Sequence, residues 1–301
     1  MKKILLIFLS LLLTTIIKAQ SLDSLMAIMG NENQVRTPVT ATFKTTRVIL
    51  SHSNETVKKY NMDFRVSHRF GDFAGDNGGS ETLYGLDNAS DIRIAFEYGV
   101  TDRLTAGFGR NKIAQLLDFY LKYKLVEQTT DNSTPVSVTL FTSSGLTPRR
   151  VESDIYDVYA HRISYVTQAI IARKFSSNLS VEILPTWLHR NYVSDFRDEN
   201  DNFAIGIAGR YKFTKRFGIV ADYYFVNSDF RQNKTNDTFY NPLGLGIEIE
   251  TGGHVFSINF ANSEGIVENN FIPETRSSWL KGGFRFGFNI SRMFTLYSPN
   301  K

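Results

Sequence analysis

The sequence contains no cysteine, and its 301 residues include only five histidines and seven prolines. The absence of cysteine excludes disulfides, thiolate chemistry and cysteine-based metal sites. Long apolar runs are equally scarce: the only one lies at the extreme N-terminus, and the mean hydropathy is -0.21. A bundle of transmembrane helices is therefore excluded, because each helix would need about 20 predominantly apolar residues.

The single apolar run has the features of an export signal. It follows a basic Met-Lys-Lys start, it spans only Ile4–Leu13, and the small residue Ala19 suits cleavage. We therefore predict a signal peptide over residues 1–19, because the run is short for a membrane anchor. Its removal takes away three lysines and no acid, which lowers the formal net charge from +4 to +1.

The segment after the signal, residues 20–36, has a helical pattern. Apolar side chains recur at helical spacing before a glycine that suits a helix end, namely Leu22, Leu25, Met26, Met29 and Gly30. We predict a short amphipathic helix followed by a linker, in the periplasm or in a lumen. A mobile tail is the alternative, because so short a helix is marginal by itself.

From Val39 onward the hydrophobic pattern has a period of two. In Asp91–Tyr98, isoleucine and aromatic residues occupy one face, and charged residues with one alanine occupy the other. Asn202–Phe213 and Trp279–Ile290 repeat this arrangement. Because successive strand side chains point to opposite faces, each segment has one apolar side and one side of charges and glycines.

A soluble β-sandwich also alternates, so other features favour a membrane. The segments have the length needed to cross a tilted bilayer, and aromatic residues gather near their ends. The connections alternate in length, as in bacterial barrels with short periplasmic turns and long external loops. The short ones are 101–103, 176–178, 214–216 and 251–253, and the long ones are 71–88, 145–157, 191–201, 228–241 and 262–278.

The fold we predict is an all-β, transmembrane, antiparallel up-and-down barrel of about twelve strands within residues 37–301. An even number of strands places both chain ends on the periplasmic side. Val39–Leu50 resembles a thirteenth strand; it folds into the lumen, lies in the periplasm, or is one of two extra strands in a barrel of about fourteen. The twelve predicted strands are Val57–Phe70, Ser90–Val100, Arg103–Asn111, Gln115–Gln128, Pro135–Ser144, Tyr159–Phe175, Leu179–Arg190, Asn202–Phe213, Phe217–Asn227, Asn241–Glu250, His254–Ala261 and Trp279–Met293.

Five segments of the chain also resemble one known family, in the same order. They are Ala41–Val48, Asp63–Gly71, Glu97–Leu104, Glu248–Phe256 and Phe286–Phe294. The family is a β-barrel family of Bacteroidota that carries only a domain-of-unknown-function label. The resemblance covers nearly all of the mature chain. It implies a barrel in the outer membrane of a Gram-negative cell envelope, and it supplies no activity and no functional residue.

This location implies three kinds of partner. Outer-membrane lipid and lipopolysaccharide would surround the apolar faces. The aromatic last strand ending in Phe294 resembles the signal read by the outer-membrane assembly machinery, although Thr295–Lys301 follows it. The N-terminal helix is a candidate contact for a periplasmic partner. We expect no nucleic-acid partner, because the mature chain lacks a clustered basic face.

If the apolar faces meet lipid, the opposite faces line the lumen. Their acids and bases nearly balance, which favours a narrow interior laced by ion pairs, because an unpaired buried charge is very costly. These charges either hold the barrel together or form a polar pathway or ligand pocket. The predicted lumen-lining residues are Asp63, Arg65, Arg69, Asp91, Arg93, Glu97, Asp118, Lys122, Lys124, Glu182, Arg210, Asp222, Glu248, Lys281 and Arg285.

The sequence predicts no catalytic residue, no cofactor and no metal site. Ser164 lies near His161, but the two are an odd number of residues apart and would face opposite sides of a strand. The leading hypothesis is a narrow channel or transporter for an unidentified small polar solute. The alternatives are a non-conducting structural or assembly component of the outer membrane, and a lipid-modifying enzyme at the barrel rim.

Overall fold

The computed structural model describes residues 36–149, 158–233 and 239–298. The predicted signal peptide and nearly all of the predicted N-terminal helix and linker lie outside these residues. Residues from Pro38 onward form one compact unit.

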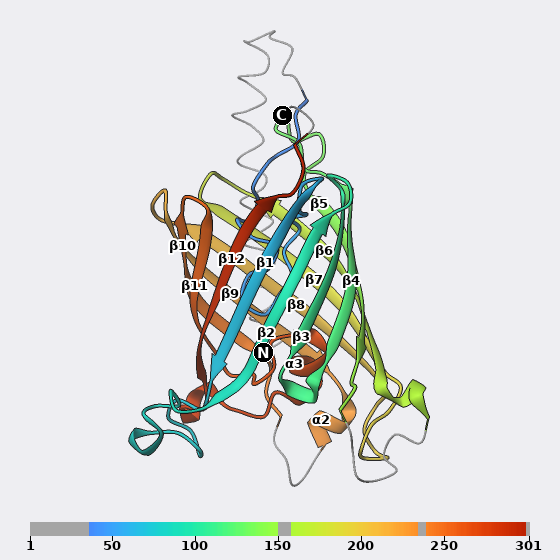
Figure 1. Ribbon diagram of the computed structural model, residues 1–301, viewed down its shortest axis with the longest axis vertical. Coiled ribbons are helices and arrows are strands. Elements are labelled where there is room, and N and C mark those ends of the chain that lie inside the picture. Colours follow the sequence, from blue (N-terminus) through green and yellow to red (C-terminus); the bar gives the residue numbers. More distant parts are fainter. Residues whose placement is uncertain (1–35, 150–157, 234–238, 299–301) are drawn as a thin grey trace, which may run out of the picture. The chain divides into compact units, whose positions relative to one another are not determined.

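Within the described residues, twelve antiparallel strands form a closed ring, which confirms the predicted fold class (Figure 1). The strands are β1 (Asn61–Phe70), β2 (Ala89–Gly99), β3 (Leu104–Asn111), β4 (Leu117–Val126), β5 (Ser137–Leu146), β6 (Ile163–Lys174), β7 (Leu179–Arg190), β8 (Asp201–Lys212), β9 (Phe217–Asn227), β10 (Leu243–Thr251), β11 (His254–Ala261) and β12 (Arg285–Thr295). The loops contain η1 (Ser80–Thr82), η2 (Ile113–Gln115), η4 (Tyr159–Arg162), α2 (Asp229–Asn233), α3 (Glu268–Glu274) and η5 (Trp279–Lys281).

Each strand pairs with the next, and β1 closes the ring on β12. Asn61 at the start of β1 pairs with Thr295 at the end of β12, so the barrel begins and ends at the same rim. Short turns such as 100–103 and 252–253 lie at this rim, and the longer connections 71–88 and 262–284 lie at the other. We call these the terminal rim and the loop rim.

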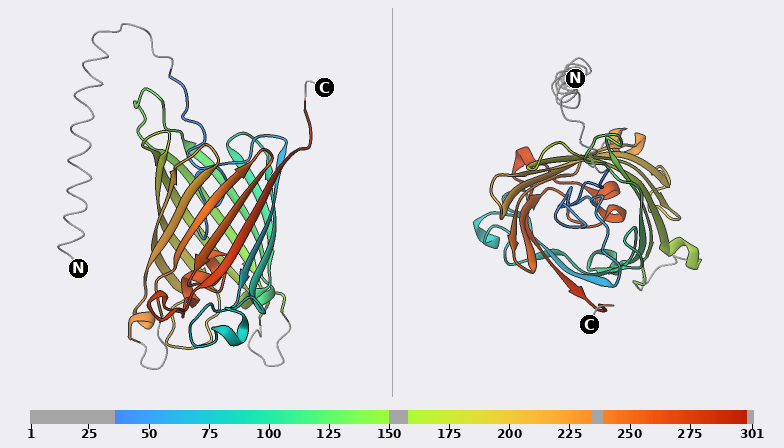
Figure 2. Two further views of the ribbon diagram at one scale, coloured as in Figure 1. Left: turned by 90° about the vertical axis from the view of Figure 1, so that its left-hand side faces the viewer. Right: turned by 90° about the horizontal axis from the view of Figure 1, so that it is seen from above.

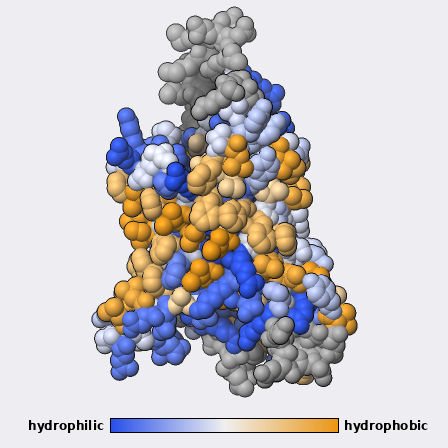
Figure 3. All heavy atoms as spheres, in the orientation of Figure 1, coloured by the Kyte–Doolittle hydropathy of each residue, from blue (hydrophilic) through white to orange (hydrophobic). Residues whose placement is uncertain are grey.

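The outer surface carries the apolar side chains of nearly every strand. Phe119 and Leu121 of β4 are 55% and 50% exposed, and Ile205 and Ile207 of β8 are 52% and 50% exposed. Figure 3 shows apolar residues gathered in a belt across one face. Such a belt is far larger than the apolar patches of soluble monomers, and lipid is the environment that fits it. No helix among the described residues has the length and apolar character to cross a bilayer.

Three predicted strand starts are wrong by four residues or more. The sixth strand begins at Ile163 instead of Tyr159, because residues 159–162 form η4. The first strand begins at Asn61 instead of Val57, because Val57 still belongs to a segment inside the barrel. The last strand begins at Arg285 instead of Trp279. Residues 279–281 form η5 there, and Gly282, with φ of 74°, ends that turn in the left-handed conformation that glycine adopts most readily.

Candidate functional site

The segment that precedes β1 folds into the lumen. We call residues 42–57 the plug. Figure 2 shows this part of the chain inside the ring of strands, viewed along the barrel axis. Phe43, Val48, Ile49 and Leu50 are buried, with Leu50 wholly inaccessible to solvent. Of the three placements open for Val39–Leu50, the structure therefore gives the lumen, and the ring needs no extra strand.

The tip of the plug is a tight turn held by one carboxylate. The backbone N–H of Val48 donates to the carbonyl of Ser51 across the turn, at 2.9 Å. The Oδ2 atom of Asp222, on β9, accepts from the N–H groups of Ile49, Leu50 and Ser51 at 3.1, 2.6 and 3.0 Å. Consecutive amides that converge on one oxygen form an anion-binding nest, so the wall holds the tip through the backbone.

A wall cation holds the two arms of the plug. The Lys122 ammonium, on β4, donates to the carbonyl oxygens of Thr46, Ser53 and Glu55 at 2.9, 3.1 and 3.3 Å. Thr46 precedes the tip turn, and Ser53 and Glu55 follow it. The Lys122 side chain therefore connects the two arms of the plug, one on each side of the tip. Like Asp222, Lys122 recognises the plug through main-chain atoms.

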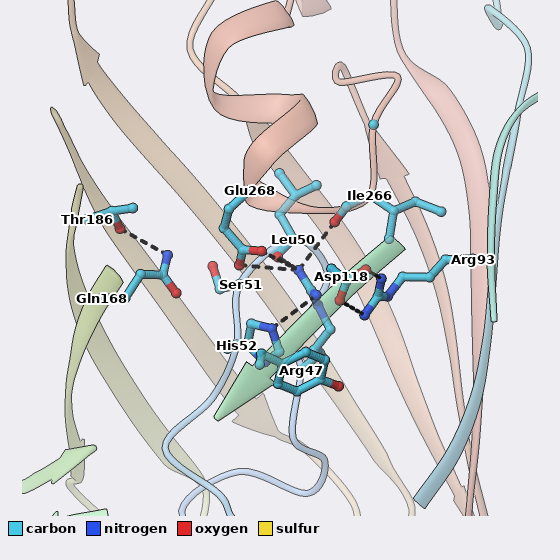
Figure 4. Close-up of polar contacts among 12 residues, drawn as sticks. Arg47, Leu50, Ser51, His52, Arg93, Asp118, Gln168, Thr186, Ile266 and Glu268 are labelled. Atoms are coloured by element: carbon cyan, nitrogen blue, oxygen red, sulfur yellow. Dashed lines mark hydrogen bonds and ion pairs between the residues drawn. The ribbon is translucent and has the colours of Figure 1, made fainter. Parts of the chain in front are cut away.

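Helix α3 packs against the plug from the loop rim. Its Phe271 and Ile272 are buried in the same apolar cluster as the plug. Arg47 of the plug reaches both carboxylate oxygens of Glu268 at 3.2 Å and the carbonyl of Ile266 at 3.3 Å, as Figure 4 shows. The plug and α3 therefore meet inside the barrel through a buried ion pair.

His52 lies beside this ion pair. Its Nε2 accepts from the Arg47 guanidinium at 3.2 Å, and its ring centroid lies 4.0 Å from that of Phe141 and 5.3 Å from that of Tyr120. Burial lowers the pKa of His52 well below 6.5, and four nearby cations, first among them Arg47, lower it further. His52 is therefore neutral in the closed lumen at pH 7.

Other wall charges pair mainly with one another, although the Thr46 hydroxyl of the plug accepts from Arg65 at 3.0 Å and donates to Glu97 at 2.9 Å. The tightest of these pairs lies between two strands, where two guanidinium nitrogens of Arg93 bond both carboxylate oxygens of Asp118 (Figure 4). Three such ion pairs occur among the inward-facing side chains of the described strands, and in each of them the base neutralises the acid. They are Arg93–Asp118, Arg65–Asp63 and Arg210–Glu248.

Most of the predicted lumen-lining residues lie on the inner wall. Twelve of the fifteen are buried there: Asp63, Arg65, Arg69, Asp91, Arg93, Glu97, Asp118, Lys122, Glu182, Asp222, Glu248 and Arg285. Lys124 and Arg210 are half-buried on β4 and β8. The prediction for Lys281 is wrong. This residue is exposed in η5, because residues 279–281 form a turn that precedes β12 and are not part of the strand.

The sequence pattern missed the apolar half of the inner wall. Val166 and Ile170 on β6 and Leu184 and Leu188 on β7 point inward and are wholly buried. Both strands also carry apolar residues outward, such as Ile171. A strand that is apolar on both faces avoids water on both faces, here through lipid outside the barrel and packed side chains inside it. Apolar residues on the inner face of β6 and β7 are therefore the signal that could have revealed a packed lumen.

The described residues contain no group of three or more histidine or acidic side chains arranged to hold a metal ion. No curated protein matches the sequence.

Several solved structures resemble the barrel. The NanC porin is 11% identical, with 77% of this chain and 98% of that chain covered and a TM-score of 0.48. The KdgM porin is 8% identical, with 78% and 99% covered and a TM-score of 0.46. The CymD monoaromatic hydrocarbon channel is 8% identical, with 79% and 89% covered and a TM-score of 0.41. The likeness is one of barrel architecture.

The sequence also matches a family description over most of its length. Residues 43–294, which include the plug except its first residue and all twelve strands except the last residue of β12, match the family described as "Membrane bound beta barrel domain (DUF5777)". The chain thus belongs to the DUF5777 family of membrane-bound β-barrel domains.

Proposed function

We propose that the protein is a narrow channel or transporter for a small solute with a polar group, in the outer membrane of a Gram-negative bacterium, as the resemblance to a Bacteroidota family also implied. The plug is its gate. The described state is the closed one, with the plug and α3 together filling the lumen.

One observation carries this proposal: Lys122 and Asp222, the two wall charges that each make three hydrogen bonds to the plug, bind only its backbone. Lys122 binds carbonyl oxygens, and Asp222 binds amide N–H groups. Water or a polar solute can replace contacts of this kind when the plug leaves. A barrel with a purely structural role has no need of wall charges that only a detachable segment satisfies.

The wall would remain intact without the plug. The ion pairs Arg93–Asp118 and Arg210–Glu248 lie within the barrel itself, and the ladder from β1 to β12 is continuous. Backbone hydrogen bonds close the ring and satisfy its polar groups in lipid. Release of the plug therefore leaves a polar pathway inside a stable barrel.

The test is conductance of the full chain in planar bilayers. The substitution Leu50→Asn puts an amide into the apolar contact at the plug tip, which weakens docking by about 2–5 kcal/mol and raises the open fraction by at least about tenfold. We expect rare openings from the natural chain and frequent conductance steps from Leu50→Asn. The matched control is Leu86→Asn in the loop after β1, where the leucine is 46% exposed.

Folding is checked by the shift in gel mobility on heating. A folded Leu50→Asn barrel that shows no conductance steps contradicts the channel and favours the alternative, a non-conducting structural component.

A further inference from the structure

The inner wall has two chemically different regions, β1–β4 and β6–β9, which we call its charged and apolar halves; β5 and β10–β12 connect them around the ring. The half formed by β1–β4 carries nine of the predicted lumen charges, with five bases and four acids. The half formed by β6–β9 is mainly apolar, with the wholly buried side chains Val166, Ile170, Leu184, Leu188 and Tyr224. The lumen is therefore amphipathic, and a molecule that replaces the plug would meet both surfaces.

Two acids stand within the apolar half. Glu182 on β7 pairs in register with Ala208 on β8, and Ala208 pairs with Asp222 on β9, so the three lie in one row across the wall. Glu182 is 1% exposed, and no described residue donates a hydrogen bond to either of its carboxylate oxygens. The backbone N–H of Asn54 faces it without hydrogen-bond geometry. Oδ1 of Asp222 also has no donor among the described residues.

These oxygens face the lumen with unused acceptor capacity. A buried carboxylate without a donor is costly, so such an arrangement persists where a partner binds. Arg210, on β8 close to this row, bonds Glu248 at 2.7 Å and forms no ion pair with either acid. Lys122 acts on Glu182, and Arg69 on Asp222, through space without an ion-pair contact. The apolar half therefore offers two acceptors of negative charge set among aliphatic side chains.

The plug itself shows what this half of the wall accepts. Ile49 and Leu50 supply apolar side chains to the buried cluster, and their amides supply N–H donors to Asp222. An apolar body with N–H donors at one end thus fits the space. Release of the plug would also remove Arg47 from Glu268, which adds a further acid to the vacated lumen.

We infer that the solute of this barrel is a small amphipathic amine, with a protonated amino group at Glu182 and Asp222 and an apolar body against the wall of β6–β9. This inference rests on the proposed channel function. An ammonium group donates up to three hydrogen bonds and supplies a direct ion-pair partner, which neither acid has among the described residues. An amphipathic anion of equal size would meet these acids with repulsion.

The experiment measures block of potassium current through the full-length Leu50→Asn barrel in planar bilayers. Three probes separate charge from apolar area: octylammonium, ethylammonium and octanesulfonate. We expect octylammonium to reach half-block at a concentration at least about tenfold below those of the other two, because it alone combines both features.

Glu182→Gln in the same barrel should raise the half-blocking concentration of octylammonium by about tenfold, because it removes the charge and keeps the shape. The matched control is Glu248→Gln, an inner-wall acid bonded to Arg210, which should leave that concentration within about twofold.

The outcomes are distinguishable. Equal block by octylammonium and octanesulfonate, with potassium current present, overturns the amine inference and leaves the channel standing. Equal effects of Glu182→Gln and Glu248→Gln overturn the assignment of the site. The complete absence of potassium current from the folded barrel overturns the proposed function itself.

Discussion

Replacing Asp222 by alanine should release the plug. The carboxylate accepts three backbone hydrogen bonds of 2.6–3.1 Å from the tip turn. A hydrogen bond to a charged group contributes about 1.5–3 kcal/mol. The alanine variant also removes the unfavourable burial of a carboxylate, which offsets part of that sum. We therefore expect docking to weaken by about 3 kcal/mol, which is about a 100-fold change in the ratio of released to docked plug.

The absence of cysteine makes this change measurable. Ser51 is wholly buried at the tip, and a single Ser51→Cys substitution supplies the one thiol of the chain. A membrane-impermeant maleimide reaches that thiol only when the plug is released. The labelling rate in Asp222→Ala should exceed that in the unsubstituted background by about 100-fold, in proportion to the released fraction.

The matched control changes an aspartate outside the lumen. Asp198→Ala breaks an ion pair with Arg190, at 3.0 Å, in the loop after β7. Its labelling rate should stay within about twofold of the reference, because the pair is remote from the plug. An unchanged labelling rate in a folded Asp222→Ala barrel would refute the idea that this carboxylate holds the tip.

Three further predictions concern the charges inside the barrel. Because the docked plug lowers the pKa of His52, the docked state binds fewer protons than the released state below pH 6.5, and docking should weaken by up to about 1.4 kcal/mol per pH unit as pH falls. His52→Gln should remove this slope in the maleimide assay when each labelling rate is divided by that of a free thiol at the same pH, since the thiolate fraction also falls with pH. Arg47→Ala leaves Glu268 buried without its base and should weaken docking by about 3 kcal/mol or more, an effect that the double variant with Glu268→Gln should largely reverse, as measured by the same labelling. Asp118→Ala strands Arg93 in the wall and should lower the free energy of unfolding in urea by about 3–5 kcal/mol, whereas an unchanged unfolding midpoint would show that water already solvates this pair.

The barrel could be predicted from the sequence because its determinants are local. A period of two over about ten residues assigns each side chain to lipid or lumen, as the outward Phe119 and the inward Asp118 illustrate. The contrast between short and long connections then fixes the direction of each strand. These rules located all twelve strands, with errors confined to ends such as Trp279–Lys281.

The plug could not be predicted in the same way, because its partners are distant in sequence. Ile49 bonds Asp222, which is 173 residues away, and Arg47 bonds Glu268, which is 221 residues away. The sequence of residues 39–50 fits two structures equally well. One is a strand of the barrel, and the other is a segment inside the lumen whose alternate side chains face opposite walls. The apolar half of the inner wall was missed for a related reason. On β6 and β7 both faces are largely apolar, so the alternation of polar and apolar residues does not show which face meets lipid and which meets the lumen.

The arrangement of these distant partners also sets an order for assembly. The plug is made first, yet Lys122 lies on the fourth strand, Asp222 on the ninth and Glu268 just before the last. Docking is complete only once the connection between β11 and β12, which carries Glu268, has been synthesised and folded. The plug precedes β1 in the chain, yet it can dock fully only after the chain has been made beyond β11.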